Sequence, residues 1–212
     1  LGPLRRWPAV GQPAGVVHVL RRAVRHSPFS FAWSSLAWPR YDFLMARGIN
    51  ALFAVIDAIR AEWSKPRVAM HQHGACPFLL RSFFVERGAA ISEDRRLQGC
   101  PAQLLAFWKV YASAELFKDE QFGQWGMEML SVEDAHVQTT FLAGSRPLDF
   151  RSGDVVFGRF YGDSDLLVMN AFGTVLVCLP LDERKDWPEA SDSLAGFLSR
   201  LHETQGSKYW EL

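Results

Sequence analysis

The sequence of 212 residues has few cysteines, no long apolar run and no net charge. Its three cysteines, Cys76, Cys100 and Cys178, are far apart and form no C-x-x-C pair, which argues against a disulfide framework and favours a reducing compartment. The longest apolar stretch, residues 48–59, is far shorter than the roughly 20 residues that cross a bilayer. The formal net charge of zero implies no general attraction to nucleic acid or to a membrane.

The motifs of several enzyme classes are missing as well. The sequence has no G-x-S-x-G elbow, no P-loop and no G-x-G-x-x-G that follows a strand. His71, His73 and Cys76 are the only local group of metal-ligand residue types, and no H-E-x-x-H or C-x-x-C motif completes a zinc site around them. We therefore expect no catalytic residues, no cofactor and no stoichiometric metal.

The residues that are present belong to an ordinary globular protein, with 49% apolar and 22% charged residues. The charge is uneven: residues 1–70 hold 10 Lys/Arg and 3 Asp/Glu, whereas the chain from Asp119 onward holds 7 and 16. This asymmetry indicates either two functional regions, an acidic partner surface, or two halves that simply neutralise each other. The first 25 residues are Arg-rich and interrupted by Pro13 and His18, unlike a signal peptide, so we expect a cytoplasmic protein.

Apolar residues at spacings of three and four predict several helices. Residues 64–77, which contain Lys65-Pro66 and Gly74, are expected to be a linker. The predicted helices are residues 42–63, residues 78–87, a segment led by Pro101 that runs through Tyr111, a short helix opened by a capping box at residues 131–134, and residues 192–204.

Three short segments rich in Val, Leu and Phe predict strands over residues 155–160, 166–170 and 174–179. The connections between them are short and contain Gly, which favours hairpins and hence an antiparallel meander. An acidic segment, residues 182–192, follows Pro180. Helices, then a meander, then a helix give an α+β fold with a twisted antiparallel sheet packed by helices.

From about Phe84 to Leu212 the chain resembles the SUKH superfamily, the Smi/Knr-type fold. Order and spacing carry the resemblance, which covers about 60% of the chain. The matching segments are the Pro-led helix at residues 100–108, the hairpin at 153–168, Gly-Thr-Val at 173–175, the closing helix at 193–198 and the Tyr-Trp-Glu tail at 209–211. Residues 1–80 are longer than the usual N-terminus of the superfamily.

Proteins of this superfamily are mostly bacterial immunity proteins that bind and block a polymorphic toxin, often a nuclease or a nucleic-acid deaminase. The resemblance therefore implies a cytoplasmic, non-enzymatic protein that neutralises a cognate toxin by direct binding, without binding nucleic acid or a membrane itself. It implies a SUKH-like α+β domain over residues 81–212. Residues 1–80, which depart from the superfamily, are expected to form a basic, largely helical or irregular extension.

Acidic and aromatic residues in predicted turns are the candidate contacts with such a partner. They are Asp163 and Asp165 in the hairpin, and Asp182, Glu183, Asp186 and Trp187 after the third strand. Trp187 is either an exposed anchor or a residue that packs onto the sheet. Two alternatives to an immunity protein stay open: a scaffold or regulatory protein of the same fold, and an enzyme that binds a divalent metal with Asp163 and Asp165.

Overall fold

A computed structural model describes residues 38–88 and 94–211, and over these ranges the chain forms four α-helices and one eight-stranded antiparallel sheet. The helices are α1 (Trp38–Trp63), α2 (Ala102–Val110), α3 (Val132–Ser145) and α4 (Leu194–Glu203). The strands are β1 (Arg67–His71), β2 (Gly74–Glu86), β3 (Tyr111–Asp119), β4 (Met127–Met129), β5 (Val155–Phe160), β6 (Leu166–Met169), β7 (Val175–Cys178) and β8 (Glu189–Ser191).

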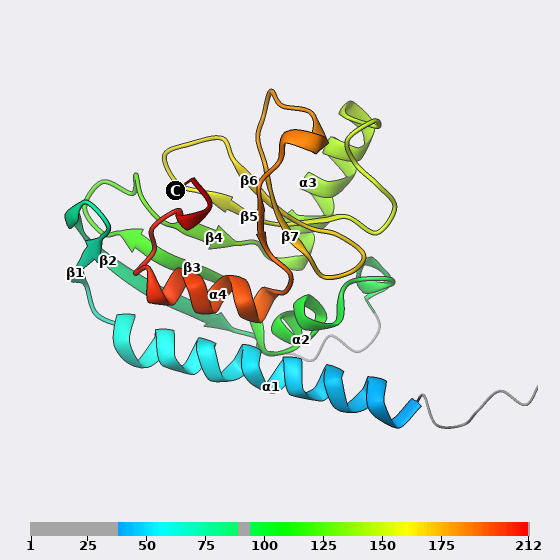
Figure 1. Cartoon of the computed structure of the whole chain (residues 1–212), viewed down its shortest axis with the longest axis horizontal. Coiled ribbons are helices and arrows are strands. Elements are labelled where there is room, and N and C mark those ends of the chain that lie inside the picture. The colour runs from blue at the N-terminus through cyan, green and yellow to red at the C-terminus, as the bar shows by residue number, and fades with distance from the viewer. Residues whose placement is uncertain (1–37, 89–93, 212) are drawn as a thin grey trace, which may run out of the picture. The chain divides into compact units, whose positions relative to one another are not determined.

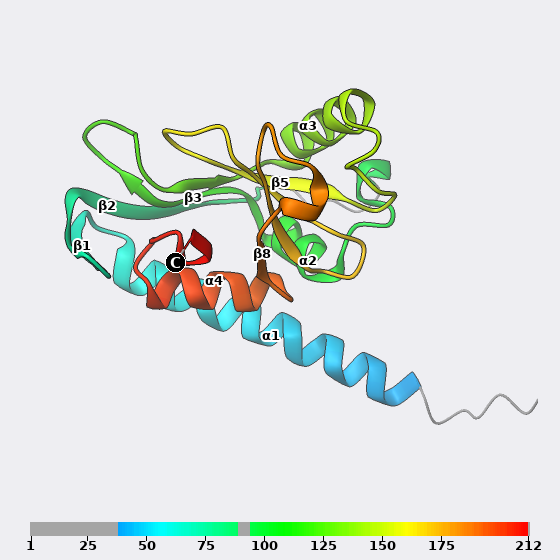
Figure 2. The ribbon, with the colours of Figure 1, turned by 45° about the horizontal axis from the view of Figure 1, so that its top comes forward.

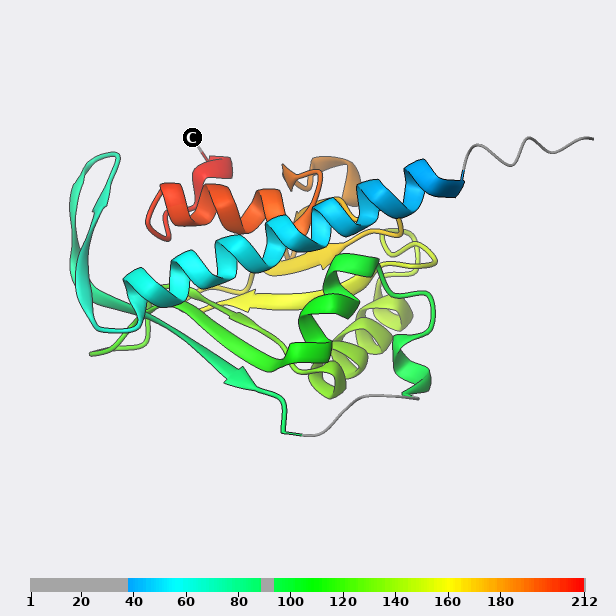
Figure 3. The same cartoon turned by 90° about the horizontal axis from the view of Figure 1, so that it is seen from below.

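Each strand pairs with its neighbour in the chain, so the sheet is a meander in the order β1 to β8 (Figure 1). The helices lie on both sides of this sheet. α1, α2 and α4 lie on one side, and α1 runs alongside α4 (Figures 2 and 3). α3 packs against β5 from the other side. This is the α+β fold with an antiparallel meander that the sequence predicts.

The expected helix at residues 42–63 is confirmed as part of α1, which starts four residues earlier. Leu52, Ile56, Ile59 and Trp63 recur at helical spacing on one face, and all four are fully buried. This face packs against α4 and β2, and the Trp63 ring meets Phe117 of β3 edge to face at 4.9 Å. The apolar periodicity of α1 therefore belongs to the main core.

The expected linker at residues 64–77 and the expected helix at 78–87 are both wrong. These residues form the β1–β2 hairpin, which turns at Gly74 with a φ of +120°. In β2, Leu80 and Phe84 point into the core, whereas Phe83 and Val85 point away from it. Apolar residues on both faces hide the two-residue period of a strand, and their bulk imitates a helical face.

The expected boundary between residues 80 and 81 falls inside β2, and both α1 and β2 contribute to the same core cluster. All described elements belong to one compact unit, Leu36–Leu212. The portion of the expected basic extension up to residue 37 lies outside the described residues.

The remaining helices and strands expected from the sequence are mostly confirmed. The helix after Pro101 ends at Val110, and Tyr111 starts β3, a strand the sequence did not predict. Ser131 caps α3 by accepting a hydrogen bond from the Asp134 backbone N–H. The three predicted strands are β5, β6 and β7, and the last helix is α4, capped by Ser193 rather than by residue 191 or 192.

Candidate partner-binding site

The loop between β7 and β8, residues 179–188, carries most of the acidic residues expected to contact a partner. Asp182, Glu183 and Asp186 are exposed, as residues of a turn are expected to be. Leu181, which precedes them, is 96% exposed. The Leu181 side chain therefore takes no part in the core and is open to contact from solvent.

Trp187 is not the exposed anchor of this loop, because its side chain is buried. Its ring meets the Phe150 ring edge to face at 5.6 Å. Its indole Nε1–H donates a hydrogen bond of 3.1 Å to the Asp182 carbonyl oxygen. Trp187 thus packs beneath the loop and fixes the backbone of Asp182, while the carboxylate of Asp182 faces solvent.

Arg146, which follows the last residue of α3, holds the first half of the loop. Its guanidinium donates to the carbonyl oxygens of Leu179 at 3.0 Å and Pro180 at 3.2 Å, and also to the carbonyl oxygen of Asp182. It also forms an ion pair of 3.0 Å with Asp149. Because these contacts satisfy three backbone carbonyls within four residues of the loop, they fix its path.

Arg184 holds the second half of the loop and points inward. Its guanidinium contacts both carboxylate oxygens of Asp154, and only 11% of the Arg184 side chain and 2% of the Asp154 side chain are exposed. The Arg184 backbone N–H donates to the Asp149 carboxylate at 2.9 Å. This hydrogen bond, together with the hydrogen bond and charge of Arg146, holds the pKa of Asp149 below its ordinary value.

The outward side chains of the loop are therefore mainly acidic, because Arg184, the arginine of the loop, pairs with the buried Asp154. Lys185 is exposed and forms an ion pair of 2.9 Å with Glu183. Asp182 and Asp186 have no ion pair within the described residues. The result is a fixed loop on which Leu181, Asp182 and Asp186 are all exposed.

Leu148, which is 95% exposed, is a second open leucine near the same loop. It lies two residues after Arg146, the residue that binds the loop backbone. Sequence reasoning missed both leucines, although a signal was present. The tripeptide Pro-Leu-Asp occurs at residues 147–149 and again at 180–182, and each copy places its leucine in a polar turn.

The hairpin carboxylates, Asp163 and Asp165, are tied to the C-terminal segment. Lys208 forms ion pairs with Asp163, with Asp165 at 3.5 Å and with Glu211 at 3.4 Å. Burial and the charge of Asp163 raise the pKa of Asp165. Burial alone would lower the pKa of Lys208, but the hydrogen bond from Lys208 to Asp163 and the surrounding carboxylates raise it. The two carboxylates that a divalent metal would need are thus both paired with one lysine.

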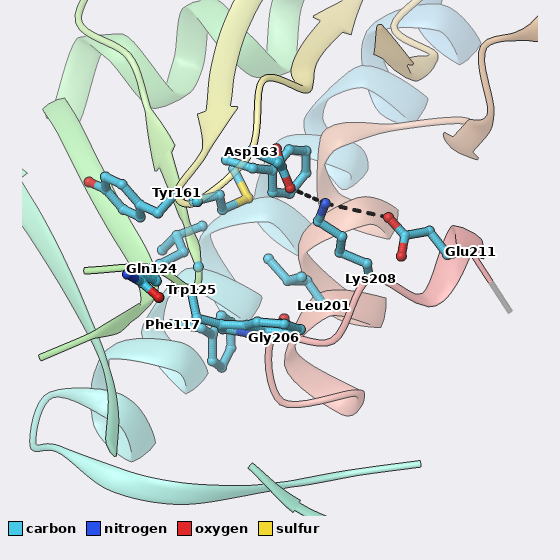
Figure 4. A pocket seen from close by; sticks show the side chains of 14 residues that line it. Phe117, Gln124, Trp125, Tyr161, Asp163, Leu201, Gly206, Lys208 and Glu211 are labelled. Atoms are coloured by element: carbon cyan, nitrogen blue, oxygen red, sulfur yellow. Dashed lines mark hydrogen bonds and ion pairs between the residues drawn. The ribbon is translucent and has the colours of Figure 1, made fainter. Parts of the chain in front are cut away.

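A pocket of about 240 Å³ lies beside this cluster (Figure 4). Its apolar part includes Phe117 and Leu201, and Lys208 reaches across its rim to Asp163 and Glu211. The pocket is therefore bounded on its polar side by an internal ion-pair cluster that joins the β5–β6 turn to the chain after α4.

The structure separates the six predicted contact residues into two groups. Asp154, the partner of Arg184, directly precedes β5, whereas Asp163 follows the end of β5. The six residues of β5 span about 20 Å. The hairpin carboxylates and the β7–β8 loop therefore lie at opposite ends of this strand and do not form one site.

The group His71, His73 and Cys76 lies at the β1–β2 turn. The His71 ring stacks on Trp125 at 5.3 Å, and its Nε2 lies 3.1 Å from the Gln205 carbonyl oxygen. Cys76 is buried. Within residues 38–88 and 94–211, no three His, Cys, Asp or Glu side chains are arranged to hold a metal ion.

No helix among the described residues is long and apolar enough to span a bilayer. No protein-family model matches this chain, and comparisons with curated proteins and with solved structures likewise give no match.

Proposed function

We propose that this chain is a SUKH-like immunity protein that neutralises a cognate toxin by binding it directly. The contact is the β7–β8 loop. The observation that carries the proposal is the outward display of Leu181, Asp182 and Asp186 on a loop whose Arg184 and Trp187 point inward. The order of sequence segments that resembles the SUKH superfamily supports the same function.

A loop that is fixed before binding loses little conformational entropy when a partner docks, so more of the contact energy appears as affinity. Arg146, Arg184 and Trp187 provide this fixation through buried or half-buried contacts. Leu181 supplies an apolar anchor, and full burial of a leucine side chain contributes about 1.5–3 kcal/mol. The exposed carboxylates act at longer range, on the rate of encounter.

The acidic character of the loop favours a toxin with a basic surface. A toxin that acts on nucleic acid needs a positive cleft for the phosphate backbone. The chain from Asp119 onward holds 16 acidic and 7 basic residues, which complements such a cleft. A scaffold of the same fold could use the same loop, and it differs from an immunity protein only in whether binding abolishes a toxic activity.

Co-expression with the toxin tests this function. The gene immediately upstream is read first; a large secreted protein with a variable C-terminal domain encoded there supplies the toxin, and the native chain should restore growth of cells that produce that domain. The double variant Asp182→Lys/Asp186→Lys should slow association with the purified toxin, and the effect should shrink at high salt. Leu181→Ser should mainly speed dissociation.

The matched control is Asp57→Lys/Glu203→Lys, which makes the same charge change at exposed carboxylates of α1 and α4. This control should bind the toxin at the native rates. The proposal fails if the native chain does not restore growth, or if the loop variants and the control bind alike.

A further inference from the structure

The outer face of the β1–β2 hairpin is unusually apolar for an uncovered surface. Val68 and Met70 of β1, together with Leu79, Phe83 and Val85 of β2, are 40–59% exposed. Their neighbours in sequence, such as Ala69, Leu80 and Phe84, are buried in the core. The hairpin therefore has an apolar face on each side, and only one of these faces packs against the core of the described residues.

These five residues, which we call the hairpin face, are continuous. Val68 and Leu79 are directly paired across the two strands, so their side chains lie on the same side of the hairpin. Leu79, Phe83 and Val85 follow one another along β2, and the Arg81 guanidinium between them lies 5.9 Å from the Phe83 ring. The hairpin face presents roughly 400 Å² of apolar surface, the size of the largest and often functional patch on a typical monomer.

No helix of the described chain covers this face. α1, α2 and α4 lie on the opposite side of the sheet, and α3 packs farther along, against β5 (Figure 2). Among residues 38–88 and 94–211, therefore, no helix lies over the hairpin face.

The charges next to the hairpin face cancel one another. Arg81 pairs with Glu120, and two further ion pairs, Lys118 with Glu115 and Arg159 with Glu128, continue across the sheet. Three basic and three acidic side chains leave no net field to attract a strongly charged partner. A two-fold contact brings the same patch of both copies together, and a patch without net charge does not repel its own copy there.

The free edge of the sheet beside this face is partly blocked. The Met70 backbone N–H donates a hydrogen bond of 2.7 Å to the Gln205 side-chain oxygen, and His71 contacts the Gln205 carbonyl. An added strand would have to displace Gln205 from β1. Contact through the face, with two sheets packed about 10 Å apart, requires no such change.

We infer that a second copy of this chain covers the hairpin face, so that two copies form a symmetric dimer by packing their β1–β2 hairpins face to face. A stable interface buries about 800 Å² per partner, with an apolar core and a polar rim. The hairpin face supplies such a core, and the three ion pairs supply the rim. This inference does not depend on the proposed toxin binding, because it concerns the purified chain alone.

The experiment measures the mass of the full chain by sedimentation equilibrium at concentrations up to about 100 µM, the range in which micromolar dimers form. We expect a dimer, and we expect Phe83→Lys to raise its dissociation constant at least about tenfold, because a charge then enters the apolar core. The matched control is Phe141→Lys on α3, where the native side chain is 66% exposed and the charge change is identical. The control should remain a dimer.

A cross-linking experiment tests the same interface without disturbing its charge. Cys76 and Cys178 are buried, and burial raises the pKa of the Cys100 thiol to about 12, so an engineered cysteine on the surface reacts first. Val85→Cys should be joined to its own copy by a short bifunctional maleimide, whereas Phe141→Cys should not. A chain that is monomeric throughout the range, or a dimer that both lysine variants leave intact, overturns the inference.

Discussion

Replacement of Arg184 by methionine should destabilise the chain strongly, because it leaves a buried carboxylate without its charged partner. Only 2% of the Asp154 side chain is exposed, and the Arg184 guanidinium contacts both of its oxygens. Once Arg184 is removed, the described contact that remains to this carboxylate is the hydrogen bond of 2.7 Å from the Arg151 backbone N–H. Methionine keeps most of the side-chain volume, so the change tests the charge rather than the packing.

Removal of one partner from a buried ion pair costs about 3–5 kcal/mol. A domain of this size has a total stability of about 5–15 kcal/mol, so the loss is a large share of it. With a urea m-value of about 2 kcal/mol/M, the midpoint of unfolding should fall by roughly 2 M. The loop should also become mobile, because Arg184 contacts Asp149 and the Trp187 ring as well.

Urea unfolding followed by tryptophan fluorescence and by circular dichroism measures this change. Lys185→Met is the matched control, because Lys185 is the neighbouring residue and its ion pair with Glu183 is exposed. Its midpoint should not move measurably. The double variant Arg184→Met/Asp154→Leu should recover much of the lost stability, since no buried charge is then unpaired. Equal midpoints for Arg184→Met and Lys185→Met would refute the reasoning.

Three further predictions concern the core, the acid limit of stability and one turn. Phe197→Ala should cost about 3–5 kcal/mol in chemical unfolding, because the Phe197 ring of α4 is fully buried. The pKa of Asp149 is lowered in the folded chain. The ionised Asp149 carboxylate should therefore contribute fully to the free energy of unfolding above its unfolded pKa of about 3.9, and this contribution should disappear as the pH falls through the folded pKa. In Asp149→Asn, the free energy of unfolding should change less with pH over this range. Gly126→Ala should destabilise the chain far more than Gly123→Ala in thermal unfolding, since both have positive φ but only the new Cβ at Gly126 would lie 2.4 Å from the Phe117 carbonyl oxygen.

The parts of the fold that the sequence predicts are those with a clear local signal. β5, β6 and β7 are separated by short turns that contain Gly, and α1 has a single apolar face. The alternation of polar and apolar residues that marks a strand is absent from β2, because Leu79, Phe83 and Val85 make its outer face as apolar as its inner one. A local signal is also missing at β3, which begins at Tyr111 immediately after the last residue of α2, with no Gly or Pro to mark the change.

The candidate site is predictable only as far as it depends on local turns. The exposure of Asp182, Glu183 and Asp186 follows from their place after Pro180. The burial of Trp187 does not, because it depends on Phe150, a residue 37 positions earlier in the chain. The inward direction of Arg184 depends in the same way on Asp154. Contacts over such separations are a property of the tertiary structure and leave no periodic pattern in the sequence.

The packing of α1 against α4 has a consequence for how the protein is made. The strands of the meander can pair one after another as they leave the ribosome, because each one meets its neighbour in the chain. Part of the apolar face of α1 is buried only after α4 has been synthesised, and about 130 residues separate Trp63 from Leu194. At 5–20 residues per second, this delay lasts roughly 7–26 s. During that interval the nascent chain presents a long amphipathic helix without its partner, which makes α1 the segment most in need of a chaperone during synthesis.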